Sequence, residues 1–138
     1  MLTIGLLGAG RIGRIHGGNI AGHPKARLVA VADASAAAAE ALASETGAKT
    51  ASIEAILADR SIGAVVICTP TDMHADLIEA AAKAGKAVFC EKPVDLNAER
   101  IRACLRVVDK AGVPLMIGFN RRFDPNFASV RQRIAAGE

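Results

Sequence analysis

The chain has little aromatic material: among its 138 residues there is no tryptophan or tyrosine, and only four are phenylalanine. A core built on large rings is therefore excluded. Hydrophobic residues nevertheless make up 51% of the sequence, and most of them are alanine, valine, isoleucine and leucine. This composition favours a parallel sheet covered by alanine-rich helices, and the length fits one domain with a proper core.

Metal-binding patterns and membrane segments are also missing. Neither the histidines nor the three cysteines (Cys68, Cys90 and Cys104) stand at zinc-ligand spacing, so we expect no metal and buried, reduced thiols. No stretch has the architecture of a signal peptide or the length of a membrane span. We therefore expect a soluble, cytoplasmic protein that binds no membrane.

A strong charge imbalance is absent as well. The formal net charge is +3, and the basic residues are scattered except within residues 100–106 and 121–133. Solvated helix faces account for these two groups, so we expect no nucleic-acid partner. The phosphate loop of NTPases, G-x-x-x-x-G-K-[ST], does not occur.

A different glycine motif opens the chain. Residues 2–7 form an apolar run typical of a buried strand, and G-x-G-x-x-G follows at residues 8–13. A second apolar run, residues 26–32, ends at Asp33, whose carboxylate can accept hydrogen bonds from a ribose diol. Strand, glycine turn, helix, strand and acid together form the dinucleotide-binding fingerprint, so the sequence predicts NAD as the cofactor.

Each glycine of the motif has a separate physical role. Gly8 permits a tight turn, Gly10 lets the backbone approach a pyrophosphate, and Gly13 lets the helix pack closely against the strand. The helix starts near Arg11 and Ile12. Its free N–H groups and positive end favour bound phosphates, so we expect both residues to contact the cofactor.

The rest of the chain alternates helices and strands. Ser35 is a suitable cap and Gly47 a suitable left-handed stop for an alanine-rich helix. Further strands are predicted at residues 49–51, 63–68, 86–90 and 114–118, and further helices at residues 53–58, 73–84 and 97–111 and from about residue 125 to 138. Such short connections favour an α/β fold of the Rossmann type, a doubly wound parallel sheet with strand order 3-2-1-4-5-6.

The unusual polar residues follow the predicted strands. Ligands bind a doubly wound sheet outside the carboxyl ends of its strands. Besides the glycine motif and Asp33, the residues at those ends are Thr69, Pro70, Glu91, Lys92 and Asn120. Because these ends meet at one edge of the sheet, we expect the residues to outline a single crevice and to contact NAD.

Lys92 is the candidate for catalysis. It follows a buried strand and precedes Pro93, which places its amine over the mouth of the crevice, where a nicotinamide would lie. Oxidation of an alcohol by hydride transfer also releases the hydroxyl proton, and a lysine close to the hydroxyl can relay it. The alternative is a surface lysine on a turn. Glu91 is either a charge partner of Lys92 or a structural neighbour, and we favour the structural role.

The two helical histidines allow more than one interpretation. His74 lies in the first turn of its predicted helix, beside the crevice. It either contacts the nicotinamide ribose or substrate, or is a satisfied polar residue at the helix start. For His16, in the first helix, packing or capping is favoured over catalysis.

Four segments together resemble one known family. They are residues 8–16 (GAGRIGRIH), 68–74 (CTPTDMH), 89–93 (FCEKP) and 118–125 (GFNRRFDP). They are similar to segments of the Gfo/Idh/MocA oxidoreductase family, and within it of the inositol 2-dehydrogenases, and the resemblance covers the whole chain. It implies NAD-dependent oxidation of a polyol's secondary hydroxyl, myo-inositol to 2-keto-inositol, with Lys92 in the proton relay.

The resemblance also implies parts that lie outside this sequence. Family members continue into a second α/β domain that completes the catalytic set, the substrate pocket and the oligomer interface. We therefore expect residues 1–119 to form the NAD-binding domain and residues 120–138 a crossover helix toward a missing or truncated substrate domain. The chain alone should be inactive. The intact enzyme should be a homo-oligomer, a tetramer, and the chain should pair through an apolar stripe of Phe123, Phe127, Val130 and Ile134.

Three other functions fit part of the pattern. The same fold could oxidise another sugar or polyol. A non-catalytic NAD-sensing module would keep the glycine motif but would have no use for a relay lysine at the position of Lys92. A methyltransferase that uses S-adenosylmethionine can carry a similar glycine loop and strand-two acid, but the Glu-Lys-Pro placement fits it poorly.

Overall fold

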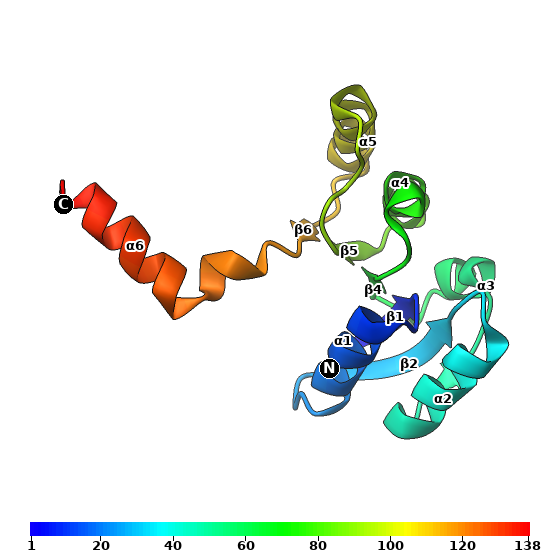
Figure 1. Ribbon diagram of the computed structural model, residues 1–138. Helices are drawn as coiled ribbons and strands as arrows, with labels where there is room; N and C mark the ends of the chain where they lie inside the picture. The colour runs from blue at the N-terminus through cyan, green and yellow to red at the C-terminus, as the bar shows by residue number, and fades with distance from the viewer.

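The computed structural model describes all 138 residues and contains one six-stranded parallel sheet (Figure 1). The strand order is β3-β2-β1-β4-β5-β6, which confirms the predicted doubly wound topology. The strands are β1 (Leu2–Leu7), β2 (Ala26–Ala32), β3 (Lys49–Thr50), β4 (Ala64–Ile67), β5 (Ala87–Cys90) and β6 (Leu115–Ile117).

Helices connect the strands and cover both faces of the sheet. They are α1 (Arg11–Ala21), α2 (Ala36–Thr46), α3 (Ile53–Ala58), α4 (His74–Lys83), α5 (Ala98–Ala111) and α6 (Pro125–Ala135), with short 3-10 turns η1 (Thr71–Met73) and η2 (Asn120–Phe123). No helix is both long enough and apolar enough to cross a membrane.

Two apolar cores lie on opposite faces of the sheet. In one, side chains of α3, α4 and α5 pack against strand residues such as Leu7 and Ile67. In the other, α1 and α2 pack against strand residues that include Leu6 and Val66. Both cores are filled mainly by aliphatic side chains, as the shortage of aromatic residues requires. Side chains of β1 and β4, the central strands of the sheet, belong to both cores. The candidate site lies at the carboxyl ends of these strands.

Polar side chains cap several of the helices, and Ser35 and Gly47 bound α2 as predicted. The Ser35 hydroxyl accepts a hydrogen bond from the backbone N–H of Ala38, and α2 ends at Gly47 with φ +73°. Ser52 and Asn97 cap α3 and α5 in the same way. These polar side chains satisfy N–H groups that a helix start otherwise leaves free.

One predicted helix begins slightly later than the sequence suggested, and the last one begins as predicted but ends earlier, at Ala135. The turn Thr71–Met73 is a 3-10 turn, and α4 starts only at His74. The segment after residue 120 is divided into η2 and α6, because the Asp124 carboxylate accepts hydrogen bonds from the N–H groups of Asn126 and Phe127 and so starts a new helix. Pro125, which has no N–H to donate, occupies the first helical position.

The last helix stands apart from the sheet. Figure 1 shows α6 extending away from the body, and its main contacts are with η2. Its predicted apolar stripe is exposed: Phe123, Phe127, Val130 and Ile134 all keep about half or more of their surface in solvent. The Arg121 guanidinium lies over the Phe127 ring, 4.6 Å from its centre. This helix therefore buries little within the chain.

Candidate functional site

The three motif glycines have the surroundings that their predicted roles require. Gly8 has φ +99°, and a Cβ built on it would lie 2.6 Å from the Cys68 carbonyl group. A Cβ on Gly13 would lie 1.9 Å from the Gly8 carbonyl oxygen, so only glycine allows this close packing of α1. Gly10 is exposed, and a Cβ there would meet nothing within 4 Å. Gly8 and Gly13 are therefore tightly packed against the chain, whereas the space beside Gly10 is free for a ligand to approach.

The start of α1 offers unpaired hydrogen-bond donors. Gly10 is its N-cap and supplies no side-chain cap, and Arg14 N–H donates to the Gly10 carbonyl. The N–H groups of Arg11, Ile12 and Gly13 come before this bond and have no partner within the helix. Together with the positive end of the helix, they form a site that suits phosphate oxygens.

Asp33 lies directly against the glycine loop. Its Oδ2 accepts a hydrogen bond of 2.6 Å from the Ala9 N–H, and its Oδ1 accepts one of 2.8 Å from the Ser35 N–H. These bonds fix the half-buried carboxylate at the end of β2, beside the start of α1. The predicted ribose-binding acid and the predicted phosphate-binding loop are therefore neighbours in space.

A cleft of about 590 Å³ joins these elements. It is lined by the glycine loop, Asp33, the start of α3 and the residues that follow β4, including Thr69 and Pro70. The Thr69 hydroxyl is buried and has no hydrogen-bond partner in the chain. An unpaired buried hydroxyl is costly unless a ligand or water satisfies it. The cleft therefore suits a nucleotide: it contains the open Gly10 and the Asp33 carboxylate, and Thr69 lines it as well.

The thiol in this cleft is uncharged. Burial, and secondarily the Glu91 carboxylate, raises the pKa of Cys68 to about 12. Burial raises the pKa of Cys90 to about 12 as well. Cys68 lines the cleft, and because its thiol stays protonated at neutral pH, it places no negative charge where phosphates would bind.

Lys92 lines a second hollow, of about 430 Å³, with Asn120, Arg121 and Asp124. The lysine is exposed, and its bond to Pro93 is cis. Asn120 belongs to η2, directly after β6. The structure therefore does not show the single crevice that the sequence led us to expect. Part of the predicted set lines a cleft at β1, β2 and β4, and Lys92 and Asn120 line a separate polar hollow at β5 and β6. Neither is lined by Arg11, Ile12, Gly13, His74 or Glu91.

Glu91 makes its contacts within the protein. Its Oε1 lies 2.8 Å from His16 Nε2, and its Oε2 accepts a hydrogen bond of 3.3 Å from the Lys92 N–H. The His16 ring also packs edge-on against Phe89, with ring centres 5.0 Å apart. These contacts support the structural role of Glu91 and the packing role of His16. The partnership itself was missed in the sequence, because the two residues are 75 positions apart.

His74 is buried, with 2% of its surface exposed, and both of its ring nitrogens face carbonyl oxygens. Nδ1 lies 2.7 Å from the Pro93 oxygen and Nε2 lies 2.8 Å from the Thr69 oxygen. No ring nitrogen is left for a ligand. Of the two interpretations of His74, the geometry supports the satisfied polar residue. The sequence contains no signal for its contact with Pro93.

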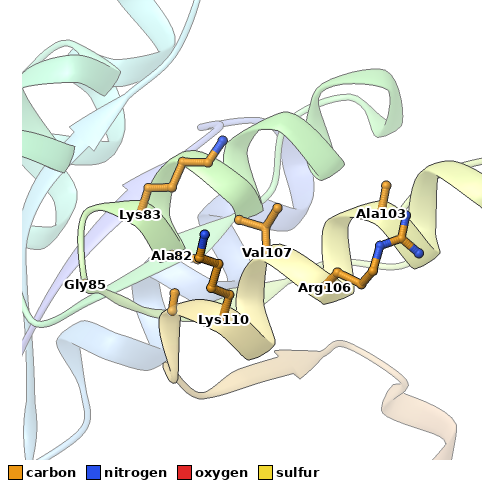
Figure 2. A pocket seen from close by; sticks show the side chains of 8 residues that line it. Ala82, Lys83, Gly85, Ala103, Arg106, Val107 and Lys110 are labelled. Carbon is orange, nitrogen blue, oxygen red and sulfur yellow. The ribbon is translucent and has the colours of Figure 1, made fainter.

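Another hollow lies away from these residues. Its volume is about 630 Å³, and it is lined by α4, α5 and Gly85, which precedes β5. Figure 2 shows Lys83, Arg106 and Lys110 around an apolar floor that contains Ala103 and Val107. None of the residues predicted for the site lines it.

Comparison with known sequences decides the family. The model of the Gfo/Idh/MocA oxidoreductase family, described by its NAD-binding Rossmann fold, matches residues 2–119. The chain belongs to this family. The match agrees with the cofactor predicted from the glycine motif and Asp33.

Similar proteins act on inositols. The inositol 2-dehydrogenase of Rhizobium meliloti is 62% identical over 99% of this chain and 41% of its own length. The scyllo-inositol 2-dehydrogenase (NAD(+)) of Bacillus subtilis is 43% identical over 96% of this chain and 40% of its own length. This Gfo/Idh/MocA chain therefore spans about two fifths of the relatives it matches.

Solved structures of relatives share the fold. The scyllo-inositol dehydrogenase of Lactobacillus casei, with bound NAD(H) and scyllo-inositol, superposes with a TM-score of 0.91 at 33% identity, over 99% of this chain and 42% of its own. A myo-inositol dehydrogenase of Corynebacterium glutamicum gives a TM-score of 0.88 at 42% identity, over 99% and 41% of the two chains.

Proposed function

We propose that this chain binds NAD along the carboxyl edge of its sheet and supplies the cofactor domain of an enzyme that oxidises a secondary hydroxyl of myo-inositol to a ketone. The observation that carries the proposal is the cleft lined by the open Gly10, Asp33 and Thr69, next to the start of α1 with its unpaired N–H groups. The inositol dehydrogenases among the relatives support the substrate class.

The predicted site residues are assigned the following roles in this reaction. NAD, when bound, supplies the hydride acceptor. The N–H groups of residues 11–13 hold the phosphates, Asp33 accepts hydrogen bonds from the adenosine ribose diol, and Thr69 and Pro70 border the cleft. Lys92 takes the hydroxyl proton as the hydride leaves, and Asn120, which lines the same hollow, helps to orient the polyol or the nicotinamide end.

The division of the chain follows from this proposal. Residues 1–119 are the NAD-binding domain, in keeping with the family match over residues 2–119. Residues 120–138 lead toward a substrate domain that corresponds to the remaining length of the relatives. In the intact enzyme that domain orients the polyol and forms a homo-oligomer. We place the protein in the cytoplasm, where its buried thiols stay reduced.

A second inositol is the alternative substrate. The Bacillus subtilis relative is a scyllo-inositol 2-dehydrogenase, and the Lactobacillus casei structure holds scyllo-inositol. The two substrates differ in the orientation of one hydroxyl. The choice between them belongs to residues that contact the ring, which this proposal places mostly in the second domain.

A chimera tests the proposal. Residues 1–119 of this chain replace the matching segment of the Rhizobium meliloti enzyme, and NADH formation is followed with myo-inositol and with scyllo-inositol. We expect turnover with myo-inositol, and Lys92→Ala should lower kcat at least ~100-fold, the scale of general acid–base catalysis, while NAD affinity stays within a few-fold. His23→Ala, in an exposed turn, is the matched control. Near-normal turnover of the Lys92→Ala chimera would remove the relay role.

A further inference from the structure

Two histidines contact the turn that carries Lys92. One belongs to the helix that follows the glycine loop, and the other also contacts Thr69 of the nucleotide cleft. The turn consists of residues 91–93 and is called the Lys92 turn below. His16 belongs to α1, the helix that follows the glycine loop, and His74 is the first residue of α4. Neither histidine touches the Lys92 amine in any hydrogen bond of the structure.

The first contact joins the Lys92 turn to α1. Glu91 receives His16 Nε2 at 2.8 Å on one carboxylate oxygen and the Lys92 N–H at 3.3 Å on the other. The Glu91 carboxylate packs against Gly118, where a Cβ would lie 3.1 Å from its Oε1. The side chains of His16 and Glu91 are each about three quarters or more buried. A shift of α1 is thus passed to the backbone of Lys92.

The second contact joins the Lys92 turn to the loop after β4. The His74 ring spans the gap between the Thr69 and Pro93 carbonyl oxygens, at 2.8 and 2.7 Å. Carbonyl oxygens only accept, so a ring N–H donates across this gap to at least one of them. Thr69 lines the nucleotide cleft and also carries the unpartnered hydroxyl. Movement of this loop is therefore passed to Pro93.

We propose that His16 and His74 are positioning residues, which transmit occupation of the nucleotide cleft to the Lys92 turn. The inference rests on the proposed NAD binding. A cofactor bound at the start of α1 and beside Thr69 would contact both of the elements to which the histidines belong or bind. The two histidine contacts are present without the cofactor, and a bound cofactor would restrain the Lys92 turn further from both sides.

Amide hydrogen exchange of the 138-residue chain tests this coupling. Saturating NAD should slow exchange in residues 90–94 at least tenfold. His16→Ala should remove most of this slowing, while NAD affinity stays within a few-fold. His16→Gln should restore it, because the glutamine amide can donate to Glu91 in place of the ring. His23→Ala, a histidine in an exposed turn, should behave as the unaltered chain does. If His16→Ala acted only by lowering the stability of the chain, His16→Gln would not be expected to restore the slowing.

A measurement on the unaltered chain covers the case in which a variant does not fold. The ring resonances of His16 and His74 should shift in NMR in proportion to NAD occupancy, whereas that of His23 should not. If NAD binds without slowing exchange in residues 90–94, or without moving the two ring resonances, the coupling is wrong and the proposed NAD binding stands. Slowing that persists in full in His16→Ala also overturns the coupling. If NAD does not bind at all, the proposed function itself fails.

Discussion

The carboxylate of Asp33 is the residue on which cofactor choice depends. It is held between the Ala9 and Ser35 N–H groups, so it cannot turn away from the cleft without losing both hydrogen bonds. Ala34 and Ser35, which follow it, provide no positive charge for an additional phosphate. An acid in this place accepts hydrogen bonds from the ribose diol of NAD and repels the 2′-phosphate of NADP.

We therefore predict that the chain binds NAD more tightly than NADP by about 1–3 kcal/mol, the scale of a charge-assisted hydrogen bond. Asp33→Ser removes the charge and keeps an oxygen acceptor, so it should lower this preference. Calorimetric titration of the chain and the variant with each cofactor measures it. Equal affinities of the unaltered chain for the two cofactors would contradict the role of Asp33.

At this scale the sequence predicts local contacts and misses distant ones. The roles of Gly8, Gly10 and Gly13 follow from their spacing, because a tight turn and a close approach are set within a few residues. The two histidine contacts could not be predicted, since His74 and Pro93 are 19 residues apart and His16 and Glu91 are 75 apart. Only the folded sheet brings such pairs together.

Between elements, one arginine ties two helices on the same face of the sheet. Arg100 of α5 forms ion pairs with Asp76, at 2.5 Å, and with Glu79 of α4. The hydrogen bond from Arg100 is the main reason that the pKa of Glu79 lies below its usual value. A carboxyl group with a lowered pKa in the folded state stabilises the fold above its usual pKa, and this contribution is lost as the pH falls through the lowered value.

We predict that Arg100→Met lowers the free energy of unfolding at pH 7 by ~0.5–1 kcal/mol, since Asp76 and part of the Arg100 side chain are in solvent, which screens the pairs. The difference from the unaltered chain should close below the usual pKa of glutamate, 4.5. Urea unfolding at several pH values measures it. Arg102→Met, which removes the exposed pair with Glu99 on the same helix, is the control and should change stability little at any pH. A gap that stays constant down to pH 3 would contradict this account.

Element boundaries were predictable where one side chain sets them. Ser35 and Gly47 bound α2 as expected. The start of α6 at Pro125 agrees with the prediction, since Asp124 followed by Pro125 is a helix-start signal, but the 3-10 turn η2 before it was not predicted. Phe123, the first residue of the predicted apolar stripe, lies in η2 and not in the helix that carries the other three. The local cap determined the boundary.

For the whole molecule, the sheet order was predictable and the place of α6 was not. Alternating helices and strands with short connections allow few topologies, and right-handed crossovers lead to the observed order. The apolar side chains of α6 have no matching surface in the chain to pack against. Nothing in the sequence of residues 125–135 fixes its direction relative to the sheet.

The exposed stripe of α6 leads to a prediction on association. Apolar faces of this kind pair with another copy when one is available, so we expect a dimer or soluble oligomer at micromolar concentrations. Phe127→Ser combined with Ile134→Ser should shift the chain toward the monomer, whereas Gln132→Ser on the same helix should not. Light scattering over a wide concentration range measures this. A monomer at every concentration would show that the stripe does not drive association.

The central claim concerns NAD binding at the carboxyl edge of the sheet. The edge is built from strand ends and loops that precede residue 120, so the 138-residue chain contains the donors and acceptors that the cofactor needs. Oxidation of a polyol requires more than cofactor binding. Without the contacts that orient a polyol, the barrier rises by roughly 7–11 kcal/mol, the range of effective-molarity effects, and oxidation by the chain should be undetectable.

Calorimetric titration with NAD tests this claim most directly, with Gly10→Ala as the comparison. Because a Cβ on Gly10 meets nothing within 4 Å, the variant should unfold within about 1 kcal/mol of the unaltered chain. Its methyl group would, however, stand where the pyrophosphate approaches. We predict one NAD bound per chain, and at least tenfold weaker binding to the folded Gly10→Ala variant. No binding by the unaltered chain, or equal binding by both, would contradict the claim.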